Sequence, residues 1–231
     1  MTEWEDLHNA NSSWRKTLVG QISDLYTVPK YLGLFREYFG REKGLDTLEL
    51  GAGNGDLSMR LVSENKGGII GSYTVSENYE EGVRNLRARG MEAKLINAEN
   101  TGLGPGSYDL VCAFDIMHHV KDPRAMAREM ARISRKYIFL TEANGLSLGR
   151  KLFERKKMYR DAGERSYLPR VYRSFFDAGV FKELGIEPFL FVFKTPERFI
   201  KHVIAFSEAI EKIPVLRWQC ASLVIFGEKR T

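Results

Sequence analysis

The sequence predicts a doubly wound α/β fold, in which helices cover both faces of a mostly parallel seven-stranded sheet. Two observations predict it: short apolar runs alternate with amphipathic stretches from residue 45 onward, and the first apolar run ends in a cluster of glycines. A chain that alternates strands with helices favours parallel pairing, because each helix returns the chain to the edge at which the previous strand began.

The expected elements follow one another along the chain. Five apolar runs are interpreted as buried strands, at residues 45–51, 67–73, 93–98, 108–114 and 136–143. Stretches with apolar residues three and four apart predict helices at 56–65, 78–89 and 123–133. Two later apolar runs, 188–194 and 221–229, would complete the sheet, with helices at 171–184 and 196–212.

The first forty residues have a helical pattern of their own. Apolar side chains recur at Leu18, Ile22 and Leu25, and Pro29 separates two helices, because proline is poorly tolerated inside a helix. We therefore expect an N-terminal helical cap or lid over residues 1–41. The main domain would then span residues 42–231.

Composition excludes several classes of protein. The formal net charge is +5, and 43% of the residues are hydrophobic and 28% charged, which is typical of a globular domain and not of a disordered chain. Two cysteines cannot build a disulfide framework or a four-thiolate zinc site, and no metal site is predicted. The first residues are acidic and polar, unlike a secretory signal, and no apolar run is long enough to span a membrane, so we expect a cytoplasmic protein.

The segment Leu-Glu-Leu-Gly-Ala-Gly-Asn-Gly-Asp, residues 48–56, is the most informative motif. Three glycines at alternate positions let the backbone turn sharply after a strand and approach a ligand closely. In an open α/β sheet, ligands bind outside the carboxyl ends of the strands. Asp56 stands where a dinucleotide-binding motif has its third glycine, which disfavours NAD.

This segment resembles motif I of the class I S-adenosylmethionine-dependent methyltransferases, and the following segments resemble the small-molecule branch called type 11. The resemblance covers residues 45–145 well and implies a Rossmann-like methyltransferase fold with S-adenosyl-L-methionine as cofactor. It implies that the cofactor's amino-acid half lies against Glu49, Gly51, Ala52, Gly53 and Gly55.

Three further cofactor contacts are implied by the same resemblance. An ungapped comparison places Tyr73, followed by Thr74, where the family has its ribose-binding carboxylate, which implies either weaker cofactor binding or a ribose contact from Glu77. The turn that reads the adenine edge matches Asn97, Ala98 and Glu99, with asparagine replacing the usual aspartate. Phe114 and Asp115 would flank the methionine moiety.

Candidate catalytic groups follow the fourth and fifth strands. A methyl transfer to a weak nucleophile benefits from a general base, and histidine titrates near neutral pH. His118 and His119 are the candidates, with Glu142 at the end of the next strand. For the histidines, packing or helix capping is the more common role, and for Glu142 a solvated loop position is an equal alternative.

The acceptor is expected to be a small molecule or a lipid-like compound, anionic or amphipathic. Its pocket would lie between the N-terminal cap and an insertion at 144–176. Residues 150–160 form a basic and apolar stretch, for which a solvated helix is the default; otherwise it would attract a phosphorylated metabolite, RNA or, as peripheral contact, a membrane surface. An RNA or protein acceptor is the second hypothesis, but nucleic acid is disfavoured because the sequence has no Asn-Pro-Pro-Tyr-type tetrapeptide and no visible appended RNA-binding module. The third is a non-catalytic methyltransferase-like binding module, which Tyr73 and Asn97 suggest.

The N-terminal aromatic residues would form either a lid over the cofactor or part of the core: Trp14, Tyr26 and Tyr31.

Overall fold

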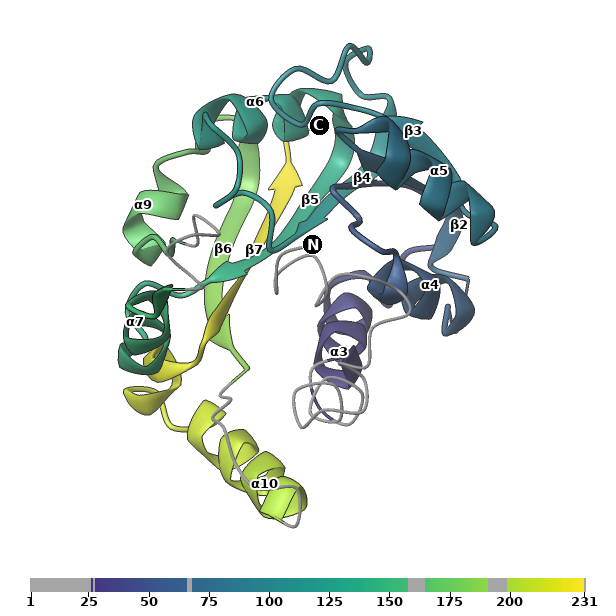
Figure 1. Cartoon of the computed structure of the whole chain (residues 1–231). Helices are drawn as coiled ribbons and strands as arrows, with labels where there is room; N and C mark the ends of the chain where they lie inside the picture. Colours follow the sequence, from purple (N-terminus) through teal and green to yellow (C-terminus); the bar gives the residue numbers. More distant parts are fainter. Residues whose placement is uncertain (1–25, 27, 66–67, 158–164, 191–198, 231) are drawn as a thin grey trace.

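A seven-stranded sheet forms the centre of the protein, and Figure 1 shows it from β3 on the right to β6 on the left. The computed structural model describes residues 26, 28–65, 68–157, 165–190 and 199–230. The order of the strands is β3-β2-β1-β4-β5-β7-β6. Their bounds are β1 Leu45–Leu50, β2 Ile70–Glu77, β3 Glu92–Leu95, β4 Tyr108–Phe114, β5 Ser134–Ala143, β6 Phe181–Phe189 and β7 Ser222–Lys229.

The strand order creates one reversal point, between β1 and β4. From β1 the chain builds outward to β2 and β3, and it then returns to place β4 and β5 on the other side of β1. All pairs among these five strands are parallel, whereas β7 pairs antiparallel with both β5 and β6. The predicted doubly wound, mostly parallel sheet is therefore confirmed, and ligands of such sheets bind at the carboxyl ends beside the reversal point.

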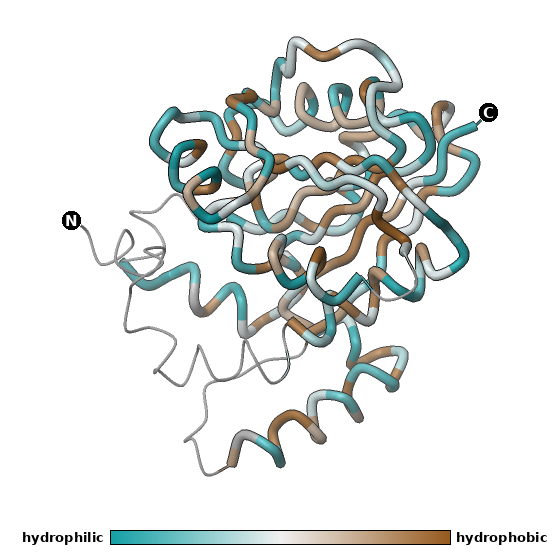
Figure 2. The backbone as a smooth tube through the Cα atoms, turned by 90° about the vertical axis from the view of Figure 1, so that its right-hand side faces the viewer, coloured by the Kyte–Doolittle hydropathy of each residue, from teal (hydrophilic) through white to brown (hydrophobic). Residues whose placement is uncertain are grey.

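Helices cover both faces of the sheet. The described helices are α3 Val28–Phe39, α4 Asp56–Ser63, α5 Glu80–Ala88, α6 Pro123–Ile133, α7 Leu148–Glu154, α9 Pro169–Arg173 and α10 Ile200–Glu211, with the short 3-10 helix η4 Leu216–Gln219. Met126 and Met130 of α6 pack in a core cluster on one face, and Phe35 and Phe39 of α3 pack in a second cluster. Because both faces are buried, the middle parts of β4, β5 and β7 are continuously apolar, and brown segments run through the centre of the tube in Figure 2.

Local sequence explains where α6 begins. Asp122 accepts hydrogen bonds from the backbone N–H groups of Arg124 and Ala125, and Pro123 occupies the first turn. An aspartate N-cap followed by proline is a strong start signal, because it satisfies donors that have no partner within the helix. The predicted helix 123–133 is therefore confirmed.

The predicted helix at 171–184 is wrong. The structure has only α9 there, and the chain enters strand β6 at Phe181. Asp177 interrupts the helical pattern, because its side chain accepts a hydrogen bond from the N–H of Gly179 in a tight turn. The predicted strand at 188–194 is correspondingly displaced, since β6 ends at Phe189 and residues 191–194 lie outside the described part.

The second N-terminal helix is confirmed as α3, with Pro29 in its first turn, where proline is tolerated. The earlier helix and Trp14 lie outside the described residues, so the division into a cap of residues 1–41 and a main domain stays a prediction. Within the ranges that the structure describes, no helix is both long and apolar enough to cross a membrane. Cys112 and Cys220 are buried free thiols.

Candidate functional site

The glycine turn connects β1 to α4 at the carboxyl edge of the sheet. Gly51, Gly53 and Gly55 all have left-handed φ values, of 68°, 58° and 76°. A Cβ at Gly51 would lie 2.8 Å from Ile116, and one at Gly55 would lie 2.7 Å from Leu86. At Gly53, by contrast, no atom of the described residues lies within 4 Å of an added Cβ. Packing therefore requires the outer two glycines, whereas the middle one faces open space.

Glu77 ends β2 beside this turn. Its Oε1 accepts a hydrogen bond from the backbone N–H of Gly53, and the side chain is 7% exposed. Burial raises the pKa of Glu77, and hydrogen bonds from the N–H groups of Gly53 and Asn78 act in the opposite direction. The turn thus brings a buried carboxylate and an open glycine together at one point.

Tyr73 lies elsewhere, in the body of the sheet. It pairs with Thr47 in the parallel ladder, and its hydroxyl donates to Oε2 of Glu49 at 2.8 Å. Thr74 is buried next to it and donates to Glu92 at 3.2 Å. Strand β2 begins three residues later than predicted and continues to Glu77, so Tyr73 and Thr74 lie in the body of the strand. The structure therefore places Glu77, not Tyr73 or Thr74, at the end of the strand.

Glu49 is the second buried carboxylate near the turn. Its side chain is 2% exposed, and burial raises its pKa to about 7, against the opposing effect of the hydrogen bond from Tyr73. Glu49 pairs with Val75 on one side and Cys112 on the other, one position before the last residue of β1. Because its pKa is raised in this way, Glu49 can change protonation state near neutral pH.

The predicted turn at 97–99 follows β3 at the same edge. Asn97 is exposed, and its side-chain oxygen accepts a hydrogen bond from the N–H of Glu99 at 2.9 Å. Glu99 in turn accepts a hydrogen bond from the N–H of Asp122, the N-cap of α6. Ala98 between them is nearly buried. The turn is thus fixed to the helix that follows β4.

Asp115 leaves β4 in a left-handed conformation, with a φ of 55°, which is uncommon outside glycine. Its N–H donates to the carbonyl of Thr141 at 2.8 Å, and its carboxylate accepts a hydrogen bond from the hydroxyl of Tyr31 at 2.8 Å. Burial, with Asp115 adding to it, raises the pKa of Tyr31, so the phenol stays protonated and donates. Phe114, just before, contacts Tyr31 edge-on at 5.7 Å between ring centres. Sequence reasoning placed Tyr31 only in a lid or in the core.

The predicted catalytic candidates separate into a buried pair and an exposed residue. Nδ1 of His118 lies 2.7 Å from Oε2 of Glu142, and both side chains are buried. Glu142 also accepts from the N–H of Met117 at 2.6 Å and from the hydroxyl of Tyr172 at 3.4 Å. Burial raises the pKa of Glu142, whereas the hydrogen bond with His118 lowers it. Glu142 is therefore not a solvated loop residue, and Tyr172 is a partner that the sequence did not indicate.

His119 occupies a different environment from His118. It is exposed, and its ring centre lies 4.1 Å from that of its neighbour. The backbone N–H of His119 donates to the carbonyl of Ile116 in the loop between β4 and α6. Of the two histidines, His119 is thus the accessible one.

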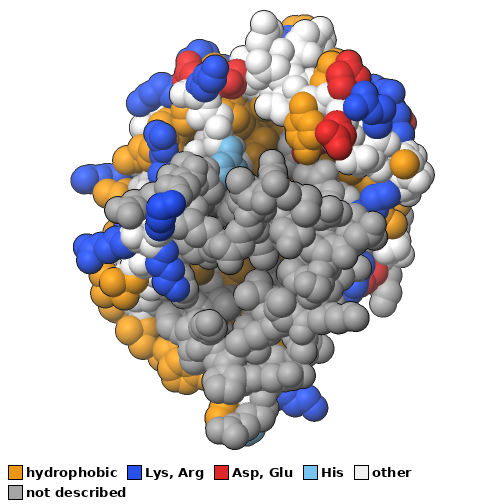
Figure 3. Space-filling model, viewed as in Figure 1, with side chains coloured by type: hydrophobic (Ala, Val, Ile, Leu, Met, Phe, Trp, Pro, Cys, Tyr) orange, Lys and Arg blue, Asp and Glu red, His pale blue; other side chains and the backbone are white. Residues whose placement is uncertain are grey.

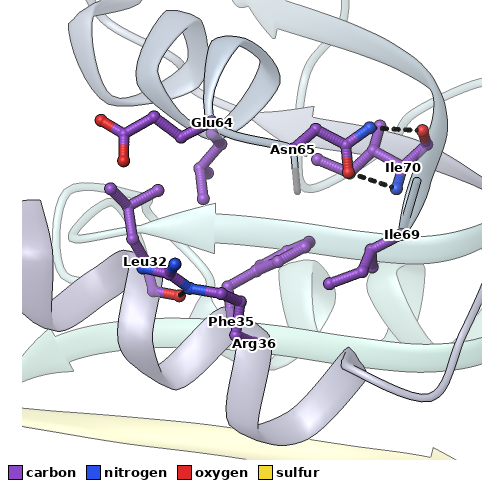
Figure 4. Close-up of a pocket in the computed structure, with 8 residues that line it drawn as sticks. Leu32, Phe35, Arg36, Glu64, Asn65, Ile69 and Ile70 are labelled. Carbon is purple, nitrogen blue, oxygen red and sulfur yellow. Dashed lines mark hydrogen bonds between the residues drawn. The ribbon is translucent and has the colours of Figure 1, made fainter. Parts of the chain in front are cut away.

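Two hollows in the described part lie away from this edge. One, of about 10 Å³, lies between α3, α4 and the start of β2 (Figure 4), and it has room for no more than one water molecule. The other, of about 330 Å³, is open and is lined by residues near the beginnings of strands, including Asp46 and Tyr108. Neither is the place where a doubly wound sheet binds its ligand.

Comparison with known proteins agrees with the position of the glycine turn. Residues 48–137 match the family described as "Methyltransferase domain". No curated protein sequence matches significantly.

Solved structures with the same fold cover almost the whole chain. A magnesium protoporphyrin IX methyltransferase from Synechocystis, with bound S-adenosylhomocysteine, has a TM-score of 0.63 at 15% identity, covering 98% of this chain and 93% of that one. An S-adenosylmethionine-dependent methyltransferase from Archaeoglobus fulgidus has a TM-score of 0.62 at 15% identity, covering 92% and 100%. One from Thermotoga maritima has a TM-score of 0.61 at 18% identity, covering 98% and 99%. Residues 48–137 thus match a methyltransferase-domain family, and the chain has the fold of these solved methyltransferase structures.

Proposed function

We propose that this protein transfers the methyl group of S-adenosyl-L-methionine to an oxygen, nitrogen or carbon atom of a small-molecule or lipid-like acceptor. One observation carries the proposal. Gly53 faces open space, with no described atom within 4 Å of an added Cβ, directly beside the buried carboxylate of Glu77. A bare backbone next to a carboxylate suits a ligand that combines an amino-acid group with a ribose.

The cofactor residues follow from their places at the carboxyl edge. Glu77 would accept hydrogen bonds from the two ribose hydroxyls, a role that the sequence comparison had assigned to position 73. The glycine turn and Glu49 would lie against the amino-acid half. The turn at 97–99 would contact the adenine, with Asn97 accepting through its side-chain oxygen. Phe114 and Asp115 would flank the methionine moiety.

S-adenosyl-L-methionine supplies an activated methyl group on a positively charged sulfur. The protein's own contribution is to align the acceptor with that group and to exclude water. His119 is exposed at the carboxyl end of β4 and would accept the acceptor's proton. His118 and Glu142 are buried against each other, and they would hold the loop that positions His119. Tyr31 would similarly hold Asp115.

A non-catalytic binding module becomes the weaker hypothesis. Tyr73 and Asn97 suggested it, because each replaces a carboxylate that the family normally has. Glu77 provides a carboxylate at the end of β2, so one of these two arguments no longer applies. Asparagine at position 97 keeps a hydrogen-bond acceptor.

Cofactor binding tests the proposal directly. Calorimetric titration with S-adenosyl-L-methionine should show saturable binding, and Glu77→Gln should weaken it at least tenfold, because hydrogen bonds to a charged group are worth about 1.5–3 kcal/mol. Glu81→Gln is the matched control, because it makes the same change on an exposed position at the start of α5. Equal affinities for the two variants, or no binding by the wild type at millimolar cofactor, would contradict the assignment.

The acceptor class needs a second experiment. Protein incubated with methyl-labelled cofactor and a cell extract should transfer label to the small-molecule or lipid fraction. Label that accumulates in RNA or in protein instead would overturn the acceptor part of the proposal and leave the cofactor part standing.

A further inference from the structure

Helix α7 exposes leucines where a helix of a globular protein normally carries polar residues. Leu148 is 70% exposed and Leu152 is 62% exposed. Residues four apart lie on the same side of a helix, so these two form one stripe. Leu146, in the turn just before the helix, is 41% exposed. Scattered single leucines are ordinary on a surface, but three within seven residues form a patch.

The 3-10 helix η4 extends this patch. Gln219 accepts a hydrogen bond from the N–H of Leu148 at 3.1 Å, and the carbonyl of Gln219 accepts one from Ser147 at 3.0 Å. Residues three apart eclipse in a 3-10 helix, which places Leu216 on the same side as Gln219 and thus toward α7. Leu216 is 41% exposed, and Val215 before it is 79% exposed. We call this surface the α7–η4 patch: Leu146, Leu148, Leu152, Val215 and Leu216.

Basic side chains lie beside the leucines on the α7 side of the α7–η4 patch. Residues 148–157 contain five Lys and Arg side chains against one carboxylate, Glu154. Arg150 and Lys151 pair with that carboxylate, and Arg155 is among the exposed cations that follow it. Figure 3 shows Lys and Arg side chains beside hydrophobic ones on the left of the molecule, at the level of α7 and above it.

The patch borders the candidate site. Helix α7 begins five residues after the end of β5, and β5 carries Glu142 at its carboxyl end. The side chain of Asn144 donates to the carbonyls of Trp218 and Cys220, at 3.0 and 2.9 Å, and thereby joins this edge of the sheet to η4. Anything bound to the patch therefore lies next to the carboxyl edge of the sheet.

We propose that the α7–η4 patch docks onto the surface of an anionic lipid bilayer. Exposed leucines enter the boundary between headgroups and acyl chains, and the neighbouring cations attract the lipid phosphates. An RNA would engage the cations but would leave the leucines in water, because sequence-independent RNA binding relies on phosphate contacts and aromatic stacking. Exposed leucines together with neighbouring cations therefore favour a bilayer over RNA.

Docking would also select the substrate. An enzyme held with this edge against a bilayer receives acceptors that partition into the membrane, so the acceptor would be an amphipathic lipid-like compound. This consequence rests on the methyltransferase function proposed above, whereas the docking itself does not.

Vesicle flotation tests the docking. Full-length protein should float with vesicles of phosphatidylcholine and phosphatidylglycerol, and much less with phosphatidylcholine alone. The double variant Leu148→Glu with Leu152→Glu should reduce the partition coefficient at least tenfold. Val62→Glu is the matched control, since Val62 is 45% exposed on α4 and lies outside the patch, and it should bind like the wild type.

Two results would overturn the proposal: absence of flotation, or flotation that the leucine variant leaves unchanged. Tight binding of an RNA oligomer that the leucine variant retains, without flotation, would instead identify an RNA surface. A wild-type dimer in analytical ultracentrifugation that the leucine variant dissociates would identify an interface between two copies. Titration of each variant with S-adenosyl-L-methionine separates the outcomes, because intact cofactor affinity shows that the fold and the proposed function survive a failure of docking.

Discussion

Replacing Glu49 by glutamine removes a buried ionisable group and keeps its shape. In the wild type, burial raises the pKa of this carboxyl from 4.5 to about 7. The side chain is 2% exposed, so solvent screens the ionised form very little. Glutamine can still accept the hydrogen bond from Tyr73, which isolates the effect of charge.

The size and sign of the effect follow from the two pKa values. Because the native state holds this proton more tightly than the unfolded state, the stability contribution is fully present below about pH 4.5 and is lost as the pH rises through about 7. At about 1.4 kcal/mol per pH unit, the wild type loses about 3 kcal/mol over this interval. The Glu49→Gln variant has no carboxyl group to titrate at this position. The difference in free energy of unfolding, variant minus wild type, should therefore be about 3 kcal/mol larger at alkaline pH than at acid pH.

Urea denaturation at a series of pH values measures this difference. Glu81→Gln, an exposed substitution, serves as the control and should show no comparable pH dependence. Calorimetry on the same variants adds a second readout. A carboxylate attracts the cofactor's positive charge, so wild-type affinity should rise with pH up to about 7 and then level off, and the variant should show a flat, weaker profile.

The difference in stability between wild type and variant should change with pH. If it stays constant from acid to alkaline pH, the argument that Glu49 is a buried titrating charge is refuted. If stability behaves as expected and cofactor affinity does not change, Glu49 titrates but lies outside the binding surface. The two readouts thus test the environment of Glu49 and its role independently.

Two further predictions concern the turn and the histidines. Gly55→Ala should lower the free energy of unfolding by about 2–3 kcal/mol, because the added Cβ meets Leu86 and alanine is strained in the left-handed conformation. Gly53→Ala should lower it by only about 1 kcal/mol and should mainly weaken cofactor binding. Equal losses of stability in the two variants would contradict this difference in packing. His118→Gln should lower the free energy of unfolding by about 2–3 kcal/mol, since it disturbs a buried pair. His119→Gln should change stability by less than about 0.5 kcal/mol and lower kcat roughly 100-fold, as measured by denaturation and initial rates, and an unchanged kcat would remove it as the general base.

Local sequence patterns were sufficient for most of the main sheet. Strand β4 and helix α6 have the bounds that were predicted, because a continuous apolar run and a capped amphipathic stretch are local signals. The stretch at 171–184 misled because its periodicity favours a helix, while pairing with β7, about forty residues later in the chain, makes its last four residues the start of a strand. Tertiary pairing overrides propensity in such a segment.

The glycine turn was predictable from residues 48–56 alone, whereas for its carboxylate the sequence offered Glu77 only as one of two alternatives. The position of Glu77 depends on where β2 begins and ends, and strand ends are set by pairing with β1 and β3. An ungapped comparison has no information on that register. The structure adds only that Glu77, four residues beyond Tyr73, is the last residue of β2.

By itself, the sequence determined the alternation of strands and helices, the sharp glycine turn and the edge at which a ligand would bind. Only the tertiary structure decided which side chains meet there. Tyr31 reaches Asp115 across 84 residues of chain, His118 reaches Glu142 across 24, and Leu148 reaches Gln219 across 71. Such contacts depend on strand order and register, and no local pattern in the chain records them, because periodicity reports which face of an element is buried and not what covers it.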